Sequence, residues 1–479
     1  MQDVSKILKK KNYGHRSVKK NARVKESLSR GQAPSFAYPR WMAVLFVLII
    51  TVACLGEDKA LNVRFGGLPK AITMLVLVMA FFVLILRGNL GRFRTIGPVS
   101  VMYLLYWGVL CLWSAVLWVI NFSDNSAITR GVEKMLFQTI AVLVAIAAVY
   151  LFGHRTVDFF AIGIYLANGA IALMEMPHYG SPFACAESLI HLVTSFGNGE
   201  GYALALEIHE VTFLYGMFLV YYLVFAPRET AAQKRMNRLQ IICSVILLLT
   251  GFKRLLIPCI PLAALLAWFV RRRKNPMRHV LGIGIFWTVF YVVFLCFVYN
   301  RGLQYAARML GINMMGRDYI WELAKRYYTF SPLYMGSGFG TVDAVIVAQL
   351  YEAKLIDQAY PLHNDVLKVF IEFGAPGLLI WSGAQYIAFP LLIKKFFDAD
   401  TAVLYISVLT LMSTTYLTDN TAFYFWCMMA LRMIPLAYGI YRKSKFSEIK
   451  EEKAKWSPPS RSDFSQLVNE RLARDGGKK

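Results

Sequence analysis

Apolar runs of membrane-spanning length recur along almost the whole chain, separated by short polar or basic connections. A helix needs about 20 apolar residues to cross roughly 30 Å of hydrocarbon. We predict twelve spanning helices, of which the seventh and eighth are short and directly adjacent. They cover residues 41–55, 71–86, 99–120, 136–152, 159–176, 202–225, 239–252, 255–270, 280–298, 366–393, 402–417 and 422–440. The pattern predicts an all-α polytopic membrane protein.

One connection, residues 299–365, is much longer than the others. A loop of this length without a function of its own is uncommon, so it is the candidate catalytic or substrate-handling part. Within 317–328, apolar residues recur at i, i+3, i+4 and i+7, which predicts an amphipathic helix along the membrane surface. A glycine run at 336–340 suits either a close approach to a ligand or a simple turn.

The same pattern divides the chain into five consecutive parts. They are a basic N-terminal arm (1–40), nine spans (41–298), the large extracytoplasmic loop (299–365), three spans (366–440) and a C-terminal tail (441–479). Because the first apolar run follows a long basic arm, we expect it to act as an uncleaved anchor.

Composition agrees with a membrane protein. The 479 residues are 57% hydrophobic and 17% charged, with a mean hydropathy of +0.47, which a soluble core of ordinary shape could not accommodate. The net charge of +23 lies in basic clusters that all fall on one side of the twelve-span model. The positive-inside rule therefore predicts that both termini are cytoplasmic. We expect these clusters to contact anionic membrane lipids, and we expect no nucleic-acid partner.

Cysteine positions indicate neither a disulfide framework nor a metal site. Six of the seven cysteines lie in or beside predicted spans, and only Cys185 lies in an external loop. We therefore expect no cofactor and no redox chemistry.

Polar residues are concentrated where the long loop enters the tenth span. His363, Asn364 and Asp365 directly precede a long apolar run, so they should lie at a membrane surface. Ionisable groups at the mouth of a membrane helix are costly unless they are paired or functional. The segment 361–381 is therefore the first candidate site.

This segment resembles a known family signature. The order His363-Asn364-x-x-Leu367 followed by Glu372-x-Gly374-x-x-Gly377 is similar to a motif of the O-antigen ligase and Wzy-type polymerase superfamily. The resemblance implies a fold like that of C-type membrane glycosyltransferases. It also implies metal-independent glycosyl transfer, with inversion, from a glycan on undecaprenyl pyrophosphate to a hydroxyl acceptor outside the cytoplasmic membrane.

His363 is the candidate catalytic residue. An imidazole can accept the proton of the acceptor hydroxyl near neutral pH, or it can hydrogen-bond the pyrophosphate as that group leaves. A purely structural histidine is the alternative. We expect Asn364 and Asp365 to cap the following helix, with a supporting role at the site as the alternative. We also expect Glu372 to pair with Lys368, and Gly374 to permit close helix packing.

Two basic elements are candidates for binding the donor pyrophosphate. Lys253 and Arg254 lie at the hinge between the seventh and eighth spans, where snorkelling to the interface is the alternative. The resemblance implies that Arg254 holds phosphate, although the family often has serine where this chain has Lys253. Arg317 precedes Trp321 in an order similar to the family's Gly-Arg-x-x-x-Trp segment. Its alternative is a solvated residue that pairs with Asp318 or Glu322.

Acidic residues near the sixth span are candidates for acceptor binding or support. Glu207 and Glu210 have the spacing of one helix face, with His209 turned away from them. We expect no metal ligation there. Glu175 and Arg432 are intramembrane charges that we expect to pair with each other or with backbone. Asp398 and Asp400 resemble the Asp-x-Asp of nucleotide-sugar enzymes but occupy a short cytoplasmic turn, so we assign them no catalytic role.

Together these features favour a polymerase of capsule, exopolysaccharide or O-antigen repeats in the bacterial cytoplasmic membrane, with its active site on the outer side. The alternatives are an O-antigen or protein O-glycan ligase, a flippase for lipid-linked oligosaccharides, and an envelope scaffold. A flippase would more typically show repeated halves, which this chain lacks. The expected partners are the lipid-linked donor, a glycan acceptor, membrane lipids and a chain-length regulator of the same pathway.

Overall fold

The computed structural model describes residues 38–57, 67–87, 91–175, 208–251, 253, 255–311, 314, 316–356 and 361–455. These residues form helices and turns and contain no strand. The chain divides into two units, one of residues 38–442 and one of 1–37 together with 443–479. Of the second unit, the structure describes only the last part of one helix. The helices and the site described below belong to the first unit.

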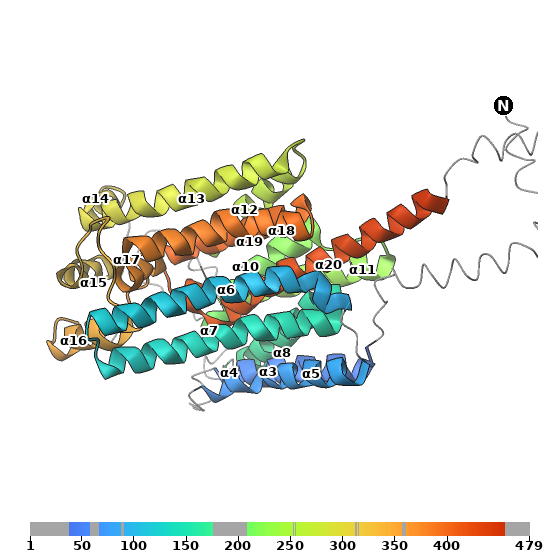
Figure 1. The fold of residues 1–479 in the computed structure, drawn as a ribbon, viewed down its shortest axis with the longest axis horizontal. Helices are drawn as coiled ribbons and strands as arrows, with labels where there is room; N and C mark the ends of the chain where they lie inside the picture. The colour runs from blue at the N-terminus through green and yellow to red at the C-terminus, as the bar shows by residue number, and fades with distance from the viewer. Residues whose placement is uncertain are drawn as a thin grey trace, which may run out of the picture. The chain divides into compact units, whose positions relative to one another are not determined.

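The helices of the first unit follow the predicted apolar runs (Figure 1). The N-terminal half contains α3 (Arg40–Leu55), α4 (Leu68–Ile72), α5 (Leu75–Arg87), α6 (Gly91–Ile120), α7 (Asn125–Phe152), the 3₁₀ turn η1 (Gly153–Arg155) and α8 (Thr156–Glu175). The middle contains α10 (His209–Val220) with the π-helical turn η3 (Tyr221–Phe225), α11 (Ala231–Thr250), α12 (Leu256–Arg271) and α13 (Pro276–Tyr299).

Short helices then occupy the long loop. They are α14 (Gly302–Met309), α15 (Arg317–Ala324) with η4 (Lys325–Tyr327), and η5 (Val342–Ile346) with α16 (Val347–Glu352). The C-terminal part contains α17 (Asp365–Gly383), η6 (Ala384–Ala388), α18 (Phe389–Phe396), α19 (Ala399–Tyr416), η7 (Thr421–Phe423) and α20 (Phe425–Lys455). The predicted amphipathic helix in the loop is thus confirmed as α15 and η4.

Five helical segments among the described residues are long and apolar enough to cross a membrane. They are Leu68–Leu86, Gly91–Ile120, Asn125–Met174, Pro276–Tyr299 and Asp365–Phe396. The third is interrupted at Gly153, whose φ of +59° ends α7 and allows the separate start of α8. An all-helical polytopic membrane protein is therefore confirmed, while the number of twelve crossings stays a prediction.

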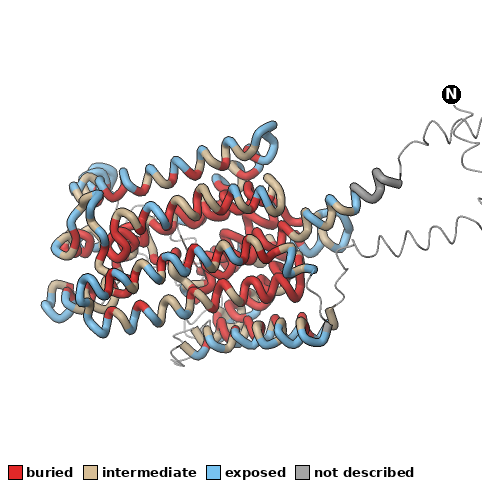
Figure 2. Tube along the Cα trace, in the orientation of Figure 1, coloured by how far each residue is buried: buried red, intermediate tan, exposed pale blue. Residues whose placement is uncertain are grey.

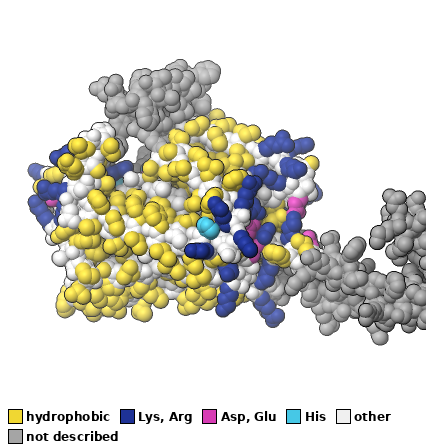
Figure 3. Space-filling view, turned by 90° about the horizontal axis from the view of Figure 1, so that it is seen from above, with side chains coloured by type: hydrophobic (Ala, Val, Ile, Leu, Met, Phe, Trp, Pro, Cys, Tyr) yellow, Lys and Arg dark blue, Asp and Glu magenta, His cyan; other side chains and the backbone are white. Residues whose placement is uncertain are grey.

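Helices α10, α17, α19 and the first half of α20 form the buried centre of the unit (Figure 2). Outer helices turn large apolar side chains outward, for example Phe82, Leu112 and Phe286, each more than half exposed. On the face drawn in Figure 3, hydrophobic side chains dominate, whereas Lys and Arg gather towards one end and in a smaller group at the other. An apolar flank with charged ends is typical of a protein surrounded by lipid.

A break in α17 shapes the end of the unit that carries the long loop. Gly374 has φ +72° and ψ −173°, and a Cβ atom there would lie 2.2 Å from the carbonyl carbon of Met335. The amide of Ala375 instead donates to the Tyr334 carbonyl at 2.8 Å. Gly374 therefore admits loop backbone into the helix, which corrects the predicted role in helix packing.

The glycine run 336–340 lies against this break and against α6 and α7. The amide of Gly338 donates to the Glu372 carbonyl, and a Cβ atom at Gly340 would lie 2.3 Å from the Ala127 carbonyl oxygen. The run therefore packs closely against the chain's own backbone, a role different from the ligand approach and the simple turn that were predicted as alternatives. Figure 1 shows α14, α15 and α16 gathered at this end of the unit.

Candidate functional site

His363 lies in the short connection before α17, close to an acidic residue from the turn after α19. Its Nδ1 is 3.5 Å from Oδ1 of Asp419, and its side chain is 24% exposed. The backbone of His363 has a φ of +49°, a left-handed conformation that is uncommon outside glycine. Such strain is often found at functional sites, which motivates a functional interpretation of this loop.

Asp419 is held in place by several donors. Its Oδ1 accepts hydrogen bonds from the Tyr424 hydroxyl at 3.0 Å and from the Asn420 amide at 2.8 Å. Burial raises the pKa of Asp419, but the contact with His363, the charge of His209 and the Asn420 amide lower it more, to about 2. The carboxylate is therefore ionised at neutral pH, where it can orient the imidazole and stabilise its protonated form.

The described part of the basic hinge approaches the same turn through His209. Lys253 Nζ lies 2.9 Å from Nδ1 of His209, and it also lies over the Phe213 ring. The His209 ring packs edge-on against Tyr424, the residue that donates to Asp419. A chain of contacts therefore links Lys253 to His363. Arg254, the predicted phosphate ligand, lies outside the described residues.

Helix α15, which carries Arg317, is attached by Trp321 to the connection 361–364 before α17. This connection, which contains His363, is called the histidine loop below. The indole Nε1 of buried Trp321 donates to the Leu362 carbonyl at 2.7 Å, directly before His363. Arg317, which begins α15 one turn earlier, is half-buried and has no ion pair or hydrogen bond to its side chain within the described residues. The basic side chain is therefore available for a ligand.

Glu322 does not form the pair with Arg317 that was considered as an alternative. It instead contacts Arg301 and Lys325, each at 2.5 Å. The hydrogen bond from Arg301, together with that from Lys325, lowers the pKa of Glu322 to about 2 although partial burial opposes the shift. Glu322 is thus already neutralised by its neighbours.

Asn364 and Asp365 have different structural roles. Asn364 caps α17 as predicted, because its Oδ1 accepts from the Leu367 amide at 2.9 Å. The fully buried Asp365 is not a cap, since its Oδ2 accepts from the Ala422 amide at 2.6 Å. Asp365 therefore joins α17 to η7, next to the turn that carries Asp419.

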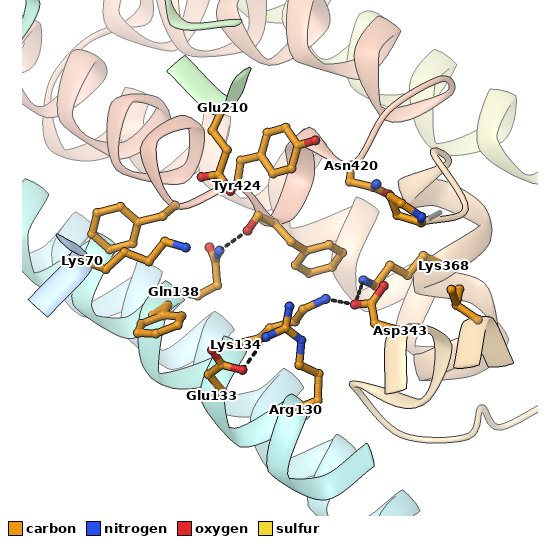
Figure 4. Close-up of a pocket in the computed structure, with 15 residues that line it drawn as sticks. Lys70, Arg130, Glu133, Lys134, Gln138, Glu210, Asp343, Lys368, Asn420 and Tyr424 are labelled. Carbon is orange, nitrogen blue, oxygen red and sulfur yellow. Dashed lines mark hydrogen bonds and ion pairs between the residues drawn. The ribbon is translucent and has the colours of Figure 1, made fainter. Parts of the chain in front are cut away.

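A pocket of about 400 Å³ opens beside this turn (Figure 4). Its lining comes from α4, α7, α10, η5, α16, α17 and the 419–425 segment. The lining residues are Lys70, Arg130, Glu133, Lys134, Phe137, Gln138, Glu210, Asp343, Val347, Pro361, Lys368, Asn420, Phe423, Tyr424 and Phe425. Because Pro361 and Asn420 belong to the connections that carry His363 and Asp419, the pocket borders the histidine loop.

Charged residues in the pocket are arranged around Asp343. Lys134 and Lys368 both contact Oδ2 of this carboxylate, and Arg130 pairs with Glu133 beside them (Figure 4). Lys368 forms its direct ion pair with Asp343, so the predicted partner Glu372 interacts with it only through the electrostatics of the site. Oε1 of Glu372 instead accepts from the amides of Gly340 and Val342, because the break in α17 brings that loop backbone to it.

The predicted acidic pair is only partly described. Glu210 does line the pocket, and its Oε2 is buried without a hydrogen-bond partner in the described part of the chain. Glu207 lies outside the described residues. No group of three His, Cys, Asp or Glu side chains among the described residues is placed to hold a metal ion.

Of the two predicted intramembrane charges, only Arg432 has a described side chain. The side chain of Glu175 lies outside the description, so the expected pairing of the two stays a prediction. Buried Arg432 lies over the rings of Tyr103 and Phe389, at 4.7 and 5.2 Å from their centroids. Arg432 is thus stabilised by cation–π contacts, and its Nη1 lies 3.4 Å from the Tyr405 hydroxyl.

Asp419, Lys134 and Asp343 were not among the predicted site residues. One signal could have indicated Asp419: it is an acidic residue in the short connection between the last two predicted spans, on the same side as His363. No local pattern distinguishes Lys134, because its partner Asp343 comes from the distant loop.

The fold and this site together define a membrane protein whose polar pocket and histidine loop lie at one end of a helical unit. Residues 239–382 match the family model described as O-antigen ligase, Wzy_C, which confirms the predicted resemblance to the O-antigen ligase and Wzy superfamily over this part of the chain. The matched segment includes Lys253, Arg317 and His363. A comparison with curated proteins finds no match.

The family match and the apolar helices support a multi-pass protein of the bacterial inner membrane with a glycan-processing role of the O-antigen ligase or polymerase type. A lipid-linked glycan donor and a glycan acceptor are the substrates that the family implies.

Proposed function

We propose that this protein polymerises repeat units of a surface polysaccharide by transferring a glycan from undecaprenyl pyrophosphate to a hydroxyl acceptor on the outer side of the membrane. The contact between His363 and Asp419 is the observation that carries the proposal. It supports a base that is oriented and charge-stabilised by a carboxylate. The family match supports the same class of reaction.

In the proposed reaction, Nε2 of His363 accepts the proton of the acceptor hydroxyl as its oxygen attacks the anomeric carbon of the donor. The bond from that carbon to the pyrophosphate oxygen breaks, and the configuration inverts. Asp419 stabilises the imidazolium that forms, and the proton is later released to solvent. Undecaprenyl pyrophosphate leaves with its negative charge.

Arg254, Arg317 and Lys253 are proposed to bind the donor pyrophosphate. Guanidinium groups can make bidentate contacts to phosphate oxygens, which stabilises charge as the pyrophosphate leaves. The attachment of Trp321 to Leu362 supports this role for Arg317, because it ties the start of α15 to the histidine loop. Basic side chains can thus supply the charge stabilisation that a metal ion supplies in other transferases, so the reaction needs no metal.

Gel analysis of surface glycan tests the polymerase assignment. Loss of a polymerase should leave a single short repeat unit on the acceptor, whereas loss of a ligase should leave full-length chains on the lipid carrier. Loss of a flippase should accumulate single lipid-linked units inside the membrane. Complementation with the full chain should restore long glycan, and either of the other two outcomes would contradict the polymerase.

Reporter fusions test the proposed orientation. A reporter after Lys450 and another at Ala231 should report cytoplasmic positions, and one at Ala348 should report an external position. A cytoplasmic signal at Ala348 would place the histidine loop on the wrong side for this reaction.

A further inference from the structure

The pocket beside the histidine loop contains two chemically different regions. Arg130, Lys134 and Lys368 surround Asp343 at one end, while Glu210 and Gln138 lie towards the other (Figure 4). Lys253 of the basic hinge is not part of the lining. Two basic regions therefore adjoin the connections that carry His363 and Asp419. The proposed donor site uses the hinge with Lys253, and the group around Asp343 is not assigned to it.

At the basic end of the pocket, the lining itself contains three cationic side chains, Arg130, Lys134 and Lys368, and two carboxylates, Glu133 and Asp343. Two ammonium groups, those of Lys134 and Lys368, share a single carboxylate oxygen of Asp343. Lys368 is only 3% exposed, so water compensates little of its charge. Glu372 does not line the pocket and forms no direct ion pair with either lysine in the described structure, although its charge interacts electrostatically with both. An anion that enters the pocket would therefore meet the ammonium groups of the lining directly.

Arg130 extends the basic region towards solvent. Its side chain is 47% exposed and pairs with Glu133 one turn away on the same helix, an arrangement that contributes little stability. Such a side chain can exchange its partner for a ligand at small cost. Arg130 is thus suited to contact an anionic group that enters the pocket.

The other end of the pocket suits sugar hydroxyl groups. Glu210 Oε2 at this end and Asn420 Oδ1, which lies closer to Lys368 in Figure 4, are buried acceptors without hydrogen-bond partners in the described part of the chain. Phe137, Phe423 and Phe425 supply apolar lining between the polar groups. A volume of about 400 Å³ lies within the range of roughly 300–1,000 Å³ typical of small-ligand sites.

We propose that this pocket binds the acceptor saccharide and selects one that carries a carboxylate or phosphate group. The anionic group contacts Arg130, Lys134 and Lys368, while Glu210 and Asn420 accept hydrogen bonds from hydroxyl groups. The assignment to the acceptor rests on the proposed transferase function, which needs a second substrate site next to His363. The polymer formed would then contain an acidic repeat unit.

Binding to the purified full chain in detergent tests this selection without requiring transfer. The probes are a disaccharide that contains glucuronic acid and its neutral, carboxyl-reduced form, measured by calorimetry or by saturation-transfer NMR. Arg130→Gln should weaken binding of the acidic disaccharide by about tenfold and leave the neutral form unchanged, because one charge-assisted contact is lost. Lys134→Gln provides a second variant. Arg235→Gln, an exposed arginine on α11, is the matched control and should change neither.

Inorganic pyrophosphate serves as a third probe that represents the donor head group. Its binding should weaken in Lys253→Gln and stay unchanged in Arg130→Gln. Equal binding of the acidic and neutral disaccharides to the unmodified chain would overturn the selection for an anion. A pyrophosphate loss in Arg130→Gln would overturn the assignment to the acceptor and give the pocket to the donor. Absence of glycosyl transfer with selective binding intact would contradict the proposed function alone.

Discussion

The two ends of the helical unit use charged residues in contrasting ways. At the end opposite the pocket, Arg271 pairs with Asp400, and Arg442 pairs with Asp398 and lies 3.6 Å from Asp400. Asp398 also caps α19, and Asp400 accepts from the Tyr438 hydroxyl. Two carboxylates and two guanidinium groups therefore satisfy one another, which agrees with a structural role for Asp398 and Asp400.

At the pocket end the same kinds of side chain are left incompletely matched. Two lysines share one carboxylate oxygen, Glu210 Oε2 lacks a hydrogen-bond partner among the described residues, and His363 has strained backbone. The comparison teaches that charge content alone does not identify a site in a membrane protein. Charged and hydrogen-bonding groups that have no partner within the protein are more informative. Such groups are costly near hydrocarbon, so they are retained where they have a function.

The largest effect is expected at His363. His363→Ala should reduce the transfer rate on the order of 10²- to 10⁴-fold with normal membrane levels, because general base catalysis is lost while little packing changes. The rate is measured with purified protein and lipid-linked donor. Activity of His363→Gln close to that of the unmodified protein would indicate hydrogen bonding in place of proton transfer, and an unchanged rate in His363→Ala would return the residue to a structural role.

The second-largest loss of transfer rate is expected at Arg317. Arg317→Ala is expected to lower transfer on the order of 10²-fold, and Arg317→Lys should recover only part of it, because an ammonium group cannot reproduce a bidentate phosphate contact. The donor dependence of the rate is the measurement. Arg308→Ala, on neighbouring α14, is the matched control. Full recovery by lysine would leave a simple charge effect as the explanation.

Asp419→Asn should have a smaller effect, on the order of 10-fold to 10²-fold, because the imidazole loses the carboxylate that orients it. With a pKa of about 2, Asp419 is fully ionised above roughly pH 4. The ratio of the unmodified rate to the Asp419→Asn rate should therefore be constant with pH above roughly pH 4. A ratio that falls to one within this range would separate Asp419 from the proton transfer.

The smallest effect on transfer is expected at the opposite end. Arg271→Gln should leave the rate unchanged, yet lower stability by roughly 1–3 kcal/mol, because Asp400 loses a charged hydrogen-bond partner. Thermal unfolding in detergent and the transfer rate are measured on the same preparation. A fall in rate without a fall in unfolding temperature would remove the contrast between the two ends.

Local patterns in the sequence were sufficient for features whose causes are local. The apolar runs predicted the helices, and the Asn364 cap and α15 followed from residues within one or two turns. The direct partner of Lys368 was not predicted, because helical spacing favoured Glu372, whereas Asp343 comes from the distant loop. Asp419 and Lys134 depend on contacts between distant segments, which a single sequence does not reveal.

The interrupted helix α17 has a consequence for biogenesis. The carbonyl oxygens of Phe373 and Phe339 accept from the indoles of Trp113 and Trp118, which belong to α6. Helix α6 leaves the ribosome long before α17, so these indoles must remain accessible in the bilayer while the intervening helices are inserted. We therefore expect α17 to reach its final position only after α6 is in place, because the indoles of α6 satisfy carbonyl groups beside the break. Shortened versions that lack residues 91–123 should be recognised by membrane quality-control proteases, even though every residue of the histidine loop is present.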